Sequence, residues 1–119
     1  MKIALRLALL VSSAGLITGM FHNHLVKSTP TTGEKLGSSP ADIRLWFNER
    51  PEIAFTSVTL LKADSTKIVT IKAVATADSM SVSAPLPQPL PAGSYLVTWR
   101  TASRDGHAIR GTYGFTIAP

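Results

Sequence analysis

The feature that most constrains this chain is a regular alternation of side chains toward its C-terminus. Every second residue is large and apolar in two segments, which contain Tyr95, Val97 and Trp99 and then Tyr113, Phe115 and Ile117. A period of two places alternate side chains on opposite faces of a β-strand. The pattern predicts two half-buried strands with aromatic residues in the core, joined by a loop over residues 102–108.

The same period recurs upstream in shorter segments. It predicts strands at 41–48, 56–62, 67–75 and 80–84, with inward residues that include Ile43, Leu45, Phe47, Val58, Leu60, Val69, Ile71 and Ala73. We expect 56–62 and 67–75 to form a hairpin, because a polar turn separates them. The proline-rich run 85–91 must cross between sheets or follow an edge, because it cannot donate regular ladder hydrogen bonds. Pro30 and Pro40 confine any earlier strand to an edge.

These segments predict an all-β fold. Strands at intervals of about 8–12 residues, with turn residues between them, favour an immunoglobulin-like antiparallel β-sandwich of about seven strands with Greek-key connections. The sequence contains no cysteine, so no disulfide can join the two sheets.

The N-terminus predicts an export leader. Residues 1–21 contain Lys2 and Arg6 followed by an apolar run, which is typical of a secretory signal. We therefore expect a periplasmic or extracellular protein with one domain over residues 22–119. The sequence leaves the cleavage site open, because Ser12-Ser13-Ala14 fits the small-residue rule better than the residues before His22. An uncleaved signal anchor, which would hold the domain at a membrane, is the alternative.

The charge pattern argues against nucleic acid as a partner. Of the 12 Lys and Arg residues, Lys2 and Arg6 belong to the leader, which leaves ten against seven Asp and Glu and a net charge of +3. These cations are scattered singly along the sequence. A nucleic-acid interface needs a clustered basic stripe or interleaved aromatic residues.

The candidate donors for a metal ion are three histidines and one aspartate. If processing leaves His22 at the N-terminus, its α-amine and ring nitrogen can chelate one ion, and His24 lies two residues further on. Near the C-terminus, the spacing of Asp105 and His107 can direct a carboxylate and an imidazole to the same side, and Gly106 permits a tight backbone. Without cysteine, a metal must be bound by such nitrogen and oxygen donors.

This mixed donor set suits tetragonal Cu(II), the divalent first-row ion that such sites bind most tightly. Zinc accepts the same donors in a tetrahedral arrangement. Taken alone, however, the residues are more typical of non-metal roles. Asp-Gly pairs are common in plain turns, and single histidines are common on solvated surfaces.

Longer stretches of the chain resemble the CopC family of periplasmic copper-binding proteins. The segment from His22 through Leu25, Ser28 and Pro30 to Gly33 is similar to the family's opening His-x-x-Leu-x-x-Ser-x-Pro-x-x-Gly. The end of the chain carries the most specific similarity, over residues 90–100, 103–107 and 111–115. The resemblance covers essentially all of the chain after the leader.

The resemblance implies one Cu(II) ion per chain, bound by the amine and ring of His22 together with Asp105 and His107. It implies a carrier or sequestering role in copper resistance or homeostasis, without catalysis and often beside a membrane copper transporter. We expect a monomer. Some family members carry a methionine-rich segment for Cu(I), whereas Met80 is the only methionine after the leader here.

Two points leave alternatives open at the N-terminus. Phe21 is not the small residue expected before a cleavage site. His24 offers a second mode of binding, because an N-terminal tripeptide that ends in histidine can wrap Cu(II) through its amide nitrogens.

Two other classes of function also stay open. One is a metal-free immunoglobulin-like interaction domain. The other is a small copper oxidative enzyme, for which the short chain leaves little substrate surface.

Overall fold

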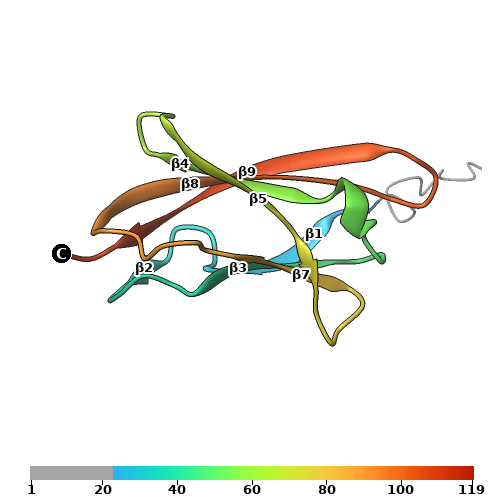
Figure 1. Ribbon diagram of the computed structural model, residues 1–119, viewed down its shortest axis with the longest axis horizontal. Coiled ribbons are helices and arrows are strands. Elements are labelled where there is room, and N and C mark those ends of the chain that lie inside the picture. Colours follow the sequence, from blue (N-terminus) through green and yellow to red (C-terminus); the bar gives the residue numbers. More distant parts are fainter. Residues whose placement is uncertain (1–22) are drawn as a thin grey trace, which may run out of the picture.

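The computed structural model describes residues 23–119, which form two facing β-sheets (Figure 1). The four-stranded sheet contains β1 (Leu25–Thr29), β3 (Asp42–Phe47), β7 (Ser81–Pro85) and β6 (Val74–Ala75). The five-stranded sheet contains β2 (Lys35–Leu36), β9 (Ala108–Ile117), β8 (Gly93–Ala102), β4 (Ser57–Lys62) and β5 (Lys67–Lys72). A single 3-10 turn among these residues, η2 (Ile53–Phe55), precedes β4. The predicted all-β sandwich is confirmed.

The order of the strands is that of an immunoglobulin-like sandwich. The order β1-β3-β7-β6 corresponds to the A-B-E-D sheet. In the other sheet, β9-β8-β4 corresponds to G-F-C, and β2 and β5 extend it at its two edges. All pairs are antiparallel except β2 with β9. Seven of the nine strands within residues 23–119 have five or more residues, in agreement with the predicted number. No helix in this part of the chain is long and apolar enough to cross a bilayer.

The core lies between the sheets and is built from the inward residues that the alternation predicted. Its aliphatic side chains with no exposed area are Ile43, Leu45, Val58, Leu60, Val82, Ala84 and Val97. Aromatic rings fill the rest. Phe47 meets Trp99 edge-on with ring centroids 5.4 Å apart, and Tyr95 stacks on Phe115 at 5.6 Å. Each such side chain contributes about 1.5–3 kcal/mol through burial, so these residues dominate the stability of the sandwich.

The prediction of one strand over residues 67–75 was wrong. The chain leaves the five-stranded sheet after Lys72 and continues as β6 in the other sheet, where Val74 pairs with Ser83. Ala73 lies between the two strands, is buried, and donates its N–H to the carbonyl of Thr56 (3.1 Å). The alternation continues through the crossing, which is why the sequence hides it. The predicted hairpin of β4 with β5 is confirmed.

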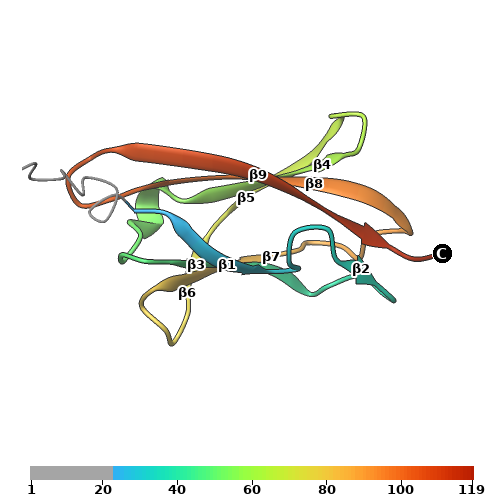
Figure 2. The ribbon, with the colours of Figure 1, turned by 180° about the vertical axis from the view of Figure 1, so that it is seen from behind.

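The proline-rich run crosses between the sheets, as predicted, and connects β7 to β8. At its end the hydroxyl of Tyr95 donates a hydrogen bond to the carbonyl of Pro91 (2.5 Å). This contact is the tyrosine corner of immunoglobulin-like folds, in which a tyrosine near the start of the sixth strand fixes the connection before it. β1 lies at the edge of its sheet, as Pro30 requires (Figure 2).

Close packing of Trp99 on β9 gives the first testable prediction. Gly111 pairs with Trp99 across β8 and β9, and a Cβ atom at Gly111 would lie 2.5 Å from the indole. We expect Gly111→Ala to lower the free energy of unfolding by about 1–3 kcal/mol, because the indole would have to move. Urea denaturation measures this. Gly37→Ala is the matched control, since nothing lies within 4 Å of its Cβ position; equal stability of the two variants would contradict the packing.

Candidate metal centre

The bend between β8 and β9 is a tight turn that presents two of the predicted donors. The strands stay paired up to Ala102 and Ala108. Beyond them, Gly106 donates its N–H to the carbonyl of Ser103 (2.9 Å), and Ser103 donates its N–H to the carbonyl of His107 (3.2 Å). Gly106 has a φ of 85°, which lies in the left-handed region that favours glycine. The sequence therefore folds here into a hairpin bend that exposes residues 104–107.

Within this bend, Asp105 and His107 contact one another directly. The Oδ2 atom of Asp105 lies 2.7 Å from Nδ1 of His107. The other carboxylate oxygen accepts hydrogen bonds from the hydroxyl of Ser103 and from the backbone N–H of His107 (3.1 Å). Both side chains are open to solvent, His107 by 75% and Asp105 by 61%. The carboxylate and the imidazole therefore lie on the same side of the bend.

The contacts of Asp105 set its charge. The hydroxyl of Ser103, followed by the ring and backbone of His107, holds the pKa of the Asp105 carboxyl well below its usual value of 3.8. The carboxylate is therefore ionised throughout the neutral range. An anionic oxygen beside an imidazole is a donor pair for a divalent cation.

The spacing of the pair fits a metal ion. Two neighbouring donors at about 2.0 Å from a square-planar ion are roughly 2.8 Å apart, close to the 2.7 Å between Oδ2 of Asp105 and Nδ1 of His107. Asp105 and His107 would hold such an ion after their side chains rotate, because an ion about 2.0 Å from both atoms would lie off the line that joins them. The same contact can instead hold the ring so that Nε2 binds the ion, with the carboxylate as its orienting partner.

The start of β1 lies at the same end of the sandwich as this bend (Figures 1 and 2). His24 donates its N–H to the Oδ1 atom of Asn48 (2.6 Å) and accepts the N–H of Asn48 at its carbonyl (3.2 Å). Four residues later, Glu52 donates its N–H to the carbonyl of Ala102, the last residue of β8 (3.1 Å). The segment 48–52 therefore ties the start of β1 to the base of the bend.

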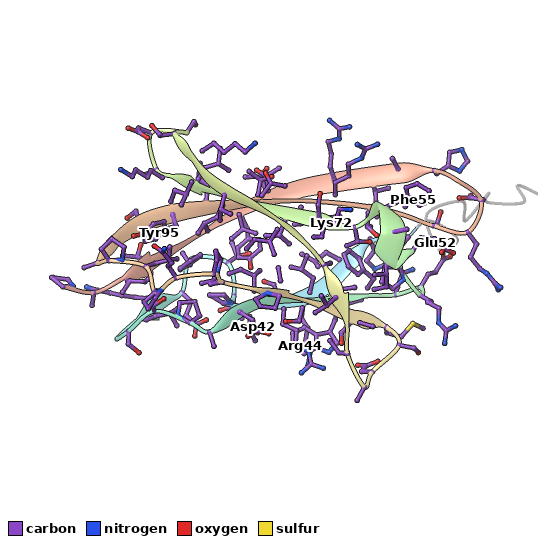
Figure 3. The ribbon with its side chains drawn as sticks, in the orientation of Figure 1. Asp42, Arg44, Glu52, Phe55, Lys72 and Tyr95 are labelled. Atoms are coloured by element: carbon purple, nitrogen blue, oxygen red, sulfur yellow. The ribbon has the colours of Figure 1, made fainter. Side chains whose placement is uncertain are left out.

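Buried hydroxyls hold this segment in place. Thr56 donates its hydroxyl to the carbonyl of Glu52 (2.7 Å), so the hydroxyl of Thr101 is the donor in the 2.7 Å contact between the two threonines. Thr101 has no exposed area and Thr56 only 3%. Glu52 and Phe55 mark this end of the molecule, and Tyr95 lies toward the opposite end (Figure 3). The chain path near His24 is therefore fixed relative to β8.

Of the four predicted donors, the structure brings together Asp105 and His107. His22 and the predicted leader, residues 1–21, lie outside the described residues. Within residues 23–119 no three His, Asp or Glu side chains gather to hold an ion. The amide nitrogen of His24 is engaged with Asn48 and the side chain of Asn23 is buried, so wrapping by the tripeptide would have to break this arrangement.

Two residues of this region have roles that sequence reasoning missed. Ser103 positions the carboxylate of Asp105, and the only signal was a hydroxyl residue two positions before an aspartate, which is frequent in turns. Asn48 holds the backbone of His24, and it was interpreted only as the residue that ends a strand. No local pattern could find this contact, because its partner lies 24 residues away.

Comparison with known proteins identifies the family. The CopC domain model matches residues 25–118. The chain belongs to the CopC family. Copper resistance protein C of Escherichia coli is 32% identical over 119 residues, which cover 90% of this chain and 94% of that protein. The crystal structure of CopC from Methylosinus trichosporium OB3b matches with a TM-score of 0.75 and 32% identity, over 82% of this chain and 95% of that one.

A CopC domain also matches part of a larger protein. The copper transport protein CutJ of Bacillus subtilis (strain 168) is 30% identical over 101 residues, which cover 84% of this chain. The chain spans only 19% of the length of CutJ. The family therefore occurs both as a protein of this size and as one portion of a longer chain.

A substitution of Ser103 tests whether its hydroxyl holds the carboxylate of Asp105. We expect Ser103→Ala to raise the pKa of the Asp105 carboxyl toward 3.8, because the hydroxyl is the largest cause of its lowering. The hydrogen bonds to the carboxylate favour the folded bend above pH 3.8, and this contribution is lost as the pH falls through the lowered pKa. NMR titration of the Asp105 carboxyl carbon measures this pKa in the wild type and in the variant. An unchanged titration curve in the variant would show that Ser103 does not hold the carboxylate.

Proposed function

We propose that this CopC family member binds one Cu(II) ion per chain and acts as a carrier or sequestering protein in copper resistance. The observation that carries the proposal is the Asp105–His107 pair, held 2.7 Å apart on a solvent-exposed bend. The relatives support it, because copper resistance protein C and the copper transport protein CutJ are named for copper.

The proposed ligands are the amine and ring of His22, the carboxylate of Asp105 and the ring of His107. Three nitrogens and one anionic oxygen make a four-donor set suited to tetragonal Cu(II). The tie between Asn48 and His24 supports the participation of His22, because it directs the chain before β1 toward the end where the bend lies. His24 is proposed as a secondary donor that competes only if its amide is released from Asn48.

The proposed role is transport or storage without turnover. A bend with both donors open to solvent suits exchange of the ion with a partner, whereas a redox enzyme needs a substrate held beside the metal. The proposed partner is a membrane copper transporter. We also propose that residues 1–21 direct export to the periplasm or cell surface, and that residues 22–119 act there as a monomer.

Copper titration of the exported protein is the direct test. We expect saturable binding at one Cu(II) per chain, and a loss of affinity of more than about 100-fold in His107→Ala, since even outer-shell partners of a metal are worth roughly 10–100-fold. Affinity should also fall as the pH is lowered, because amine and imidazole donors must lose protons to bind. Competition against a chelator with a visible absorption band measures each value.

Asp64→Ala is the matched control for Asp105→Ala. Asp64 is likewise an exposed turn aspartate, which accepts the N–H of Thr66 (2.9 Å) and has a lowered pKa caused chiefly by that residue. It lies in the turn between β4 and β5, away from the bend. Weak binding in Asp105→Ala alone supports the proposed site, and equal loss in both variants, or no saturable copper in the wild type, refutes it.

A further inference from the structure

The five-stranded sheet carries only positive charge. Its strands β4, β5, β8 and β9 contain no Asp or Glu, and the cations on them are Lys62, Lys67, Lys72, Arg100 and Arg110. All seven carboxylates of the chain lie in other segments. The net charge of the domain is modest. This face is positive because the cations are gathered on it and the carboxylates lie elsewhere.

Three of these cations form a row across the sheet. The register pairs Arg110 with Arg100, Arg100 with Ser57, and Ser57 with Lys72. Directly paired residues point to the same side of a sheet, and neighbouring strands are about 4.8 Å apart. Arg100, Arg110 and Lys72 are all exposed on the side opposite the core. The row therefore presents three charges along one line of the outer face.

This row costs stability. Like charges directly opposite on paired strands destabilise a sheet, and Arg100 faces Arg110. The one salt bridge found among residues 23–119 joins His107 to Asp105, so no carboxylate in this part of the chain forms a salt bridge with the row. An external anion would offset the repulsion. The arrangement is thus better explained by a ligand than by the fold.

The surroundings of the row indicate what kind of anion it meets. The next row consists of paired threonines, Thr112, Thr98, Thr59 and Thr70, whose hydroxyls bond to one another across the strands at 3.1 and 3.0 Å. The apolar side chains beyond them, Leu61 and Leu96, are half-buried. A protein partner would need protruding aromatic or apolar anchors, and the cationic and threonine rows carry none. An extended anionic surface is the better match.

We propose that this face docks on a lipid bilayer that carries anionic headgroups. The two arginines would meet headgroup phosphates, and the threonine hydroxyls would face the same polar layer. Arg100 is three residues before Ser103, and Arg110 is three residues after His107. Docking would therefore hold the Asp105–His107 bend next to the membrane. The contact is separate from copper binding and does not depend on the leader.

Vesicle sedimentation of the exported protein tests this proposal. The probes are vesicles of phosphatidylglycerol and phosphatidylcholine in equal parts, and vesicles of phosphatidylcholine alone. We expect binding to the first, weakened by added salt, and little binding to the second. The Arg100→Gln/Arg110→Gln double variant should bind about 25-fold more weakly, at about fivefold for each cation removed.

Lys27→Gln/Arg50→Gln is the matched control, because it removes the same net charge from outside the five-stranded sheet. Its affinity for the phosphatidylglycerol vesicles should be much closer to that of the wild type. The arginine variant should also melt no lower than the wild type, since it removes a like-charge pair, so weak binding cannot be assigned to unfolding. Equal weakening in both variants, or equal binding to both kinds of vesicle, overturns the proposal.

Discussion

The continuous pairing of β8 with β9 is the constraint on which the rest of the structure depends. Ten residue pairs, from Gly93 with Ile117 to Ala102 with Ala108, run without a register shift. Alternate residues of this ladder point inward and build the core around Trp99. The others point outward and form the cationic and threonine rows. The bend that closes the ladder presents Asp105 and His107, so core, surface and candidate site share one hairpin.

A second set of contacts relates that hairpin to the start of the domain. The backbone of His24 is held by Asn48, Glu52 is bonded to the end of β8, and two buried threonine hydroxyls secure the segment between them. A chain entering β1 is thereby brought to the end of the sandwich where the bend lies. This arrangement supports the proposal that one ion is shared by both places, because the two places lie at the same end of the sandwich.

Much of this architecture follows from local sequence. Alternation alone located the inward faces of β3, β4, β8 and β9, because a half-buried strand imposes a period of two. It could not show that the chain changes sheets at Ala73, since the period continues through the crossing. It also could not find β2, whose two residues are too few to show a period. The spacing of Asp105 and His107 predicted their contact, whereas the roles of Ser103 and Asn48 depend on the folded chain.

The segregation of charge could not be predicted from the sequence either. The cations look scattered there, because residues far apart along the chain, such as Lys72 and Arg110, come to lie in one row only through strand pairing. The central claim is that one ion meets both the start of the domain and the bend. Paramagnetic broadening of amide resonances by a substoichiometric amount of Cu(II) tests it most directly. We predict simultaneous loss of signals from residues 23–25 and 103–107. Broadening confined to one of these segments would contradict the account.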